Sequence, residues 1–165
     1  MTGLTEFNQM SPDQAAEVIR PCVDVERWVA EVVSRRPYAD VEELVATARG
    51  AADPFTDAEV EGALAHHPRI GERAQGESAE ASLSRAEQAQ LSVGADVQRQ
   101  LEQGNRDYEN RFGRVFLIRA AGRSSEEILD QLQSRLGNDV ATENSVVADQ
   151  LRQIALVRLG QAVAA

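Results

Sequence analysis

Residues 11–14, Ser11-Pro12-Asp13-Gln14, open a stretch that predicts a helix running to about Arg20. A Ser followed three residues later by Gln is a capping box, in which each side chain accepts a bond from the other residue's backbone N–H. Pro12 falls at the first helical position, where proline is favoured because no N–H partner is needed. The same spacing, with Ser, Thr or Asp before Glu, recurs at Asp40 to Glu43, Thr56 to Glu59, Ser84 to Glu87 and Ser124 to Glu127.

Apolar spacing and glycines complete this helical pattern. The expected helices cover residues 11–20, 25–35, 40–50, 56–65, 84–92, 95–112 and 124–136, with a last one from about Glu143. Residues 68–80 are rich in Gly, Glu, Ser and Arg and predict a loop. Residues 115–118 are β-branched and aromatic, so they indicate either a buried extended segment, which we favour, or a turn into the next helix. We predict one all-α domain over residues 1–165, a bundle of about seven to nine helices.

The charge, the cysteine count and the absence of lysine exclude several classes of function. The net charge of -10 disfavours nucleic acid, because phosphates would be repelled. Cys22, the single cysteine, excludes an intrachain disulfide and predicts a small core residue. The chain has 17 basic residues and no lysine, so a side-chain Schiff base is excluded and anions must be held by arginine or backbone N–H. No apolar run approaches the ~20 residues of a membrane helix, and we expect an intracellular protein.

Both histidines stand together in His66-His67-Pro68-Arg69-Ile70-Gly71-Glu72. Proline disfavours helical geometry in the preceding residue, so the fourth helix is expected to end at Ala65 or His66. A helix carboxyl end favours a protonated imidazole, which suits an acid catalyst. The same arrangement equally describes a helix end stabilised by a cation, with no catalytic purpose. A metal site from His66, His67 and Glu72 lacks a third nitrogen or sulfur ligand, and we predict none.

A second candidate stretch, Ser84-Arg85-Ala86-Glu87-Gln88, has the same ambiguity. Ser84 and Glu87 match a capping box, and helix capping alone would explain why both residue types occur at these positions. A helix amino terminus also offers free N–H groups that bind a carboxylate or carbonyl oxygen. The two interpretations are compatible, since a capping Glu can still present an oxygen to a cleft. The arginines of the chain, Arg119 and Arg158 among them, are expected to be solvated or salt-bridged.

These motifs, taken in order, resemble one family. The residues that carry the resemblance are His67 to Gly71, Ser84 to Gln88, Arg111-Phe112-Gly113, Val115 to Ala120 and Ile154 to Leu159. Their order and spacing resemble 2-oxo-4-hydroxy-4-carboxy-5-ureidoimidazoline (OHCU) decarboxylase, from Phe7 to Leu159. Arg114-Val115 departs from the Phe-Pro that many members have there, and this affects the local loop shape only. The carboxyl end also lacks a Ser-Lys-Leu type peroxisomal address, which favours a cytoplasmic location.

The resemblance implies an all-α homodimer without cofactor or metal, acting on OHCU as its small-molecule substrate and releasing CO2 to leave (S)-allantoin. It implies that His67 donates the proton and that Glu87 is its acidic partner, as a base or an orienting group. The substrate-contacting positions that it implies are Pro68, Ser84, Arg85, Glu87, Gln88, Ile118, Arg119, Ala120 and Arg158. Two other functions compete: a non-enzymatic helical binding module, which requires an exposed apolar groove, and a metal-assisted ureide hydrolase, which chelators would inactivate.

Overall fold

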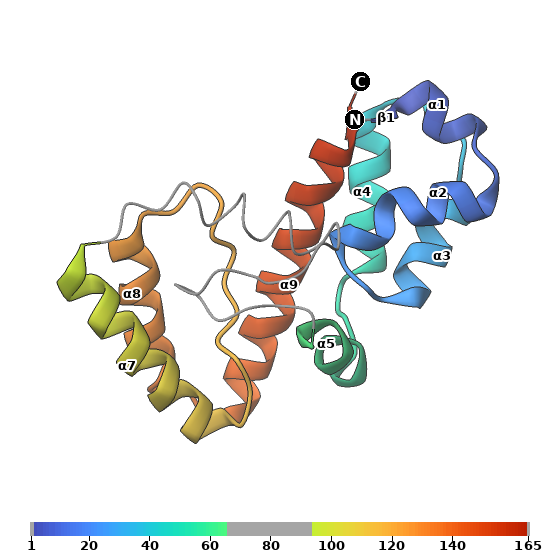
Figure 1. Cartoon of the computed structure of the whole chain (residues 1–165). Coiled ribbons are helices and arrows are strands. Elements are labelled where there is room, and N and C mark those ends of the chain that lie inside the picture. Colours follow the sequence, from blue (N-terminus) through green and yellow to red (C-terminus); the bar gives the residue numbers. More distant parts are fainter. Residues whose placement is uncertain (1, 66–93, 165) are drawn as a thin grey trace. The chain divides into compact units, whose positions relative to one another are not determined.

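The computed structural model describes residues 2–65 and 94–164. The fold is all-α, as predicted, with eight α-helices in the described residues (Figure 1). They are α1 (Leu4–Gln9), α2 (Pro12–Ile19), α3 (Glu26–Ser34), α4 (Val41–Ala51), α5 (Asp57–Leu64), α7 (Ala95–Phe112), α8 (Ser125–Arg135) and α9 (Val140–Ala162), with a 3-10 helix, η1 (Arg20–Cys22). Strands β1 (Thr2–Gly3) and β2 (Val163–Ala164) pair in parallel, so the two ends of the chain lie side by side.

Each predicted capping position within the described residues begins a helix, namely α2, α4, α5 or α8. Ser11 accepts the N–H of Gln14 at 3.2 Å, and the Gln14 side chain accepts the N–H of Ser11 at 3.2 Å. Thr56 and Glu59 exchange the same two bonds, of 3.1 and 2.9 Å. Side-chain caps at Asp40 and Ser124 begin α4 and α8. The box at residues 84–87 and the predicted loop at 68–80 lie outside the described residues.

Two elements depart from the prediction. The last helix begins at Val140, three residues before the expected start, because the Asp139 carboxylate accepts the N–H of Thr142 at 2.7 Å. This bond lowers the pKa of Asp139. Helix α1 was not predicted: Gly3 precedes it without a side-chain cap, and the helix is anchored by Phe7, which is fully buried.

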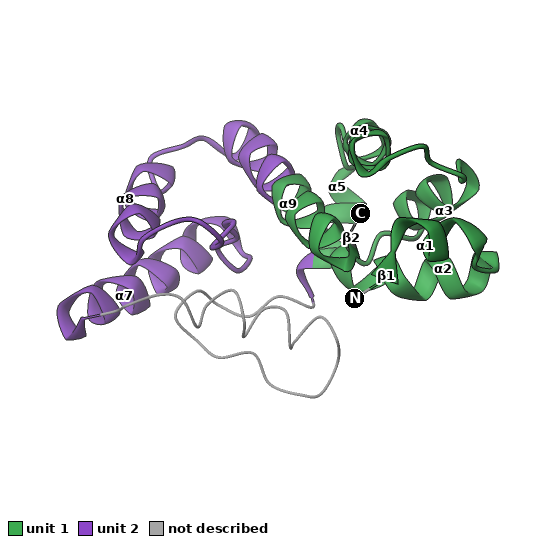
Figure 2. Ribbon diagram, turned by 90° about the horizontal axis from the view of Figure 1, so that it is seen from above, with its two compact units in different colours: residues 1–63, 151–165 green, residues 64–150 purple. Residues whose placement is uncertain are grey.

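The chain divides into two compact units, shown in green and purple in Figure 2. Unit 1 holds residues 1–63 and 151–165, and its core includes Trp28, whose indole N–H donates to the carbonyl of Ala48 at 2.9 Å and ties α3 to α4. Cys22 is buried in the same unit, as predicted for a small core residue. Burial of a side chain as large as Trp28 contributes about 4 to 6 kcal/mol at 25 cal/mol per Å².

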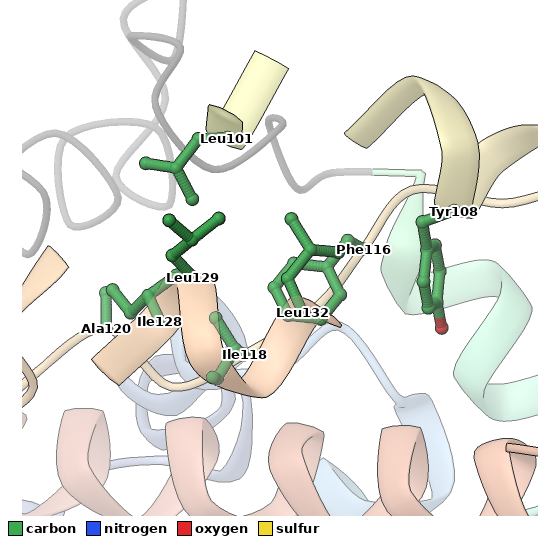
Figure 3. Packing of buried hydrophobic residues seen from close by; sticks show 8 residues of the cluster. All are labelled: Leu101, Tyr108, Phe116, Ile118, Ala120, Ile128, Leu129 and Leu132. Atoms are coloured by element: carbon green, nitrogen blue, oxygen red, sulfur yellow. The ribbon is translucent and has the colours of Figure 1, made fainter. Parts of the chain in front are cut away.

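Unit 2 holds residues 64–150, and its described core joins α7, the segment 115–120 and α8. Figure 3 shows the eight buried residues of this cluster: Leu101, Tyr108, Phe116, Ile118, Ala120, Ile128, Leu129 and Leu132. Helices α7 and α8 approach closely at Gly104, where an added Cβ would lie 2.5 Å from Cδ2 of Leu132. Gly113 ends α7 with a φ of 70°, a left-handed conformation that favours glycine.

Candidate functional site

The predicted catalytic pair, His67 and Glu87, lies outside the described residues. The same is true of Pro68, Ser84, Arg85 and Gln88. Four predicted substrate-contacting residues are described: Ile118, Arg119 and Ala120 in unit 2, and Arg158 in unit 1. The described part of the candidate site is therefore the segment that carries residues 118–120.

The segment 115–120 is neither helix nor strand, and most of it is buried. Phe116, Leu117, Ile118 and Ala120 are buried, while Arg119 is partly exposed. The predicted burial is confirmed for residues 116–118, and α8 does not begin until Ser125. The extended conformation that we favour for this segment stays a prediction. Its apolar side chains anchor it in the unit 2 core, as Figure 3 shows for residues 116, 118 and 120.

Two buried side chains fix the backbone of this segment. Arg135 on α8 donates from Nη1 to the carbonyl oxygen of Leu117 at 2.8 Å. On the other side of Ile118, the N–H of Arg119 donates to Oε1 of Gln150 on α9 at 3.0 Å. Arg135 is 3% exposed and its bond to Leu117 is buried, while Gln150 is 8% exposed and its bond to Arg119 is partly buried. Bonds of this kind, made in a low-dielectric interior, hold a segment in one conformation.

The segment ends in a turn that its own arginines stabilise. Arg119 donates from Nη1 to the carbonyl of Ala121 at 2.7 Å, and Arg123 donates from Nε to the carbonyl of Arg119 at 2.9 Å. Burial, and next the positive charge of Arg119, lower the pKa of Arg123. Gly122 has a φ of 79°, a left-handed conformation that suits a glycine in a turn.

A buried ionic cluster holds α7, α8 and α9 around the segment. Glu143 has no exposed surface and accepts from Arg135 at 2.6 Å (Nη2) and 3.0 Å (Nε), from Asn138 at 3.1 Å and from the hydroxyl of Tyr108. Burial, and next the bond to Glu143, raise the pKa of Tyr108 to about 12. The Arg135 guanidinium also lies 4.5 Å from the ring centre of Phe116, a cation–π contact. A single arginine thus joins the ionic cluster to the segment.

The sequence did not single out Gln150 or Arg135. Nothing in the sequence marks Gln150, since glutamine on a helix is usually solvated. Arg135 falls near the predicted carboxyl end of its helix, where interaction with the helix dipole already explains a basic residue.

Arg158, which was expected to be solvated or salt-bridged, lies on α9 within unit 1 and is buried. The residue is 1% exposed, and Nη1 donates to the carbonyl of Pro21 at 3.2 Å. The physical reason is its position on the buried face of α9, beside Leu159 and Ala155. Its implied contact with substrate stays a prediction.

A groove of about 550 Å³ lies in unit 1 between α2 and α3. Its walls include Ala16, Val29 and Val33, with Arg20 and Arg36 among the charged groups. None of the four site residues that the structure describes lines it. In residues 2–65 and 94–164, no group of three or more His, Cys, Asp or Glu side chains could hold a metal. None of the helices described there is long and apolar enough to cross a membrane.

The fold belongs to a class of all-α proteins seen in two solved structures. One is an OHCU decarboxylase crystallised in the presence of (S)-allantoin, with a TM-score of 0.68 and 22% identity, covering 92% of this chain and 97% of that one. The other is an (S)-allantoin synthase, with a TM-score of 0.71 and 14% identity, covering 98% of this chain and 54% of that one.

Sequence comparison identifies the family within this class. The family model of OHCU decarboxylase matches residues 8–160. An OHCU decarboxylase of Amia calva is 31% identical over 94% of this chain and 91% of its own length. A uric acid degradation bifunctional protein of Bacillus sp. (strain TB-90) is 25% identical over 96% of this chain, which spans 32% of that protein. The chain belongs to the OHCU decarboxylase family.

Proposed function

We propose that this protein decarboxylates OHCU to (S)-allantoin, the last step in converting urate to allantoin, and that it is a carboxy-lyase acting without a cofactor. The observation that carries the proposal is the family match over residues 8–160, which includes every motif of the predicted site in its expected order. The buried segment that presents residues 118–120 supports it, because a rigid backbone suits the orientation of a small substrate.

The substrate itself can delocalise the electron pair that remains when CO2 leaves. When the C–C bond to the carboxylate breaks, CO2 leaves and the electron pair passes toward the conjugated C=N group of the imidazoline ring. The ring nitrogen that takes up the electron pair gains a proton, which leaves an enol. The enol then gains a proton on one face of its ring carbon, and its hydroxyl loses a proton as the carbonyl of allantoin forms. A chain without lysine can perform this chemistry, since it needs only to orient the substrate and transfer protons.

In this proposal His67 donates the proton that sets the handedness of the product, and Glu87 accepts a hydrogen bond or a proton from the substrate hydroxyl. Pro68, Ser84, Arg85 and Gln88 would contact the substrate with residues 118–120, and Arg158 would contribute a further contact.

The neighbouring histidine offers a matched control for this assignment. His67→Asn should lower kcat by about 10² to 10⁴, the usual contribution of general acid catalysis. His66→Asn makes the same substitution one position earlier, and it should leave kcat near the wild-type value. The assay follows freshly generated OHCU and the optical activity of the allantoin formed from it. Equal effects of the two substitutions, with both variants folded, would contradict the assignment of His67.

We also propose that the protein is a cytoplasmic homodimer and that residues 1–165 form one domain. Sedimentation or light scattering should give twice the chain mass, whereas a mass equal to one chain would overturn the dimer. Urea unfolding should give coincident transitions for probes in the two units, as expected for one cooperative domain. Separate transitions would show that the two units unfold independently, and would contradict the single domain.

A further inference from the structure

The segment around Ile118 has its backbone polar groups paired in an alternating pattern. The carbonyl of Leu117 and the N–H of Arg119 bond to Arg135 and Gln150. Among the described residues, the N–H and carbonyl of Ile118 and the N–H of Ala120 have no hydrogen-bond partner. The two paired groups face α8 and α9, whereas the groups without a partner in the described residues comprise two donors and one acceptor.

Such groups are unusual in a buried segment. Ile118 is 4% exposed and Ala120 is 7% exposed, yet more than nine in ten buried backbone groups in native proteins are paired. A ligand rich in adjoining carbonyl and N–H groups would satisfy them, and the ureido and ring amide groups of OHCU and allantoin have this chemistry. The N–H groups of Ile118 and Ala120 would donate to substrate oxygens, and the carbonyl of Ile118 would accept a hydrogen bond from a substrate N–H.

We propose that Gln150 is a positioning residue for the reaction, which holds the N–H of Arg119 so that the N–H groups of Ile118 and Ala120 face the substrate. This inference rests on the proposed function. Gln150 suits the role because it is an uncharged acceptor on a long helix and is almost fully buried. Without its Oε1, the amide of Arg119 loses its partner and the peptide groups on either side are free to rotate. Arg135 holds the preceding carbonyl in the same way.

Three variants test the role of Gln150 through the separation of KM from kcat. Gln150→Leu removes the acceptor and should raise KM about tenfold, equal to about 1.4 kcal/mol of binding free energy. Gln150→Glu keeps an acceptor oxygen in either protonation state and should keep KM within about threefold of wild type. Gln161→Leu makes the same change at an exposed position on the same helix and should change neither constant. A merely structural role would lower kcat through the folded fraction and leave KM unchanged, and that result would overturn the proposal.

A second measurement keeps the test independent of how well Gln150→Leu folds. Wild-type protein labelled with ¹⁵N is titrated with (S)-allantoin, and the amide resonances of Ile118 and Ala120 should shift on binding. If (S)-allantoin binds while both resonances stay in place, the proposal is wrong. The two hypotheses fail differently: wild-type protein that does not accelerate OHCU decay overturns the proposed function together with this inference. An active wild type with unchanged KM in Gln150→Leu overturns this inference alone.

Discussion

The substitution Arg135→Met tests how far the ionic cluster of unit 2 supports the folded state. It removes three bonds to the Glu143 carboxylate and one to the carbonyl of Leu117. Among residues 2–65 and 94–164, the buried carboxylate of Glu143 then keeps Asn138 and Tyr108 as its hydrogen-bond partners. Breaking a buried ion pair by removing one partner costs about 3 to 5 kcal/mol, because an uncompensated charge is left in the interior.

Arg35→Met provides the matched control. Arg35 pairs with Glu31 at 3.1 Å, but its side chain is 61% exposed, against 4% for Arg135. An exposed pair contributes about 0 to 1 kcal/mol, so the same substitution should have little effect there. In a chain of this length, the loss expected for Arg135→Met corresponds to a fall in Tm of roughly 6 to 20 °C. Urea unfolding followed by far-ultraviolet circular dichroism measures both variants. Equal stability of the two would refute the argument that burial decides the cost.

Three further predictions concern glycines and the buried tyrosine. Gly113→Ala should destabilise the fold by about 1 to 2 kcal/mol, because Gly113 has a left-handed φ. The control Gly50→Ala lies in open space on α4 and should stabilise the fold by up to about 1 kcal/mol in the same urea assay. Gly104→Ala should cost about 1 to 3 kcal/mol because its Cβ overlaps Leu132, and an unchanged Tm would contradict that close packing. The raised pKa of Tyr108 favours the neutral phenol in the folded state, so the free energy of unfolding should fall as pH rises from about 10 toward about 12. Tyr108→Phe should reduce that fall, and an identical pH profile would contradict it.

The helices with local signals could be predicted from the sequence. Helix α7 has glycine at both ends, and its predicted bounds, residues 95–112, are those observed. The start of α9 was missed because Asp139 caps the N–H of Thr142, and Thr completes no Ser-to-Glu capping pattern. Helix α1 has no side-chain cap, and its stability comes from tertiary burial of Phe7. Prediction therefore succeeded where a complete capping pattern, flanking glycines or regular apolar spacing marked the helix.

The burial of the candidate site segment could be predicted from the sequence, whereas the side chains that bind its backbone could not. The apolar run from residue 115 to 118 indicated burial, and the structure confirms it. The partners of its backbone, Arg135 and Gln150, come from two different helices and approach it only after the chain has folded. Sequence patterns place charged and amide side chains at the surface, so burial of Glu143 and Gln150 follows only from tertiary structure.

The decay of OHCU in the presence of the wild-type protein tests the central claim most directly. The substrate is generated fresh, its absorbance is followed with and without protein, and the circular dichroism of the product is recorded. With the wild-type protein, OHCU should decay well above the spontaneous rate and give allantoin as a single (S) enantiomer. Decay at the spontaneous rate with racemic allantoin would contradict it.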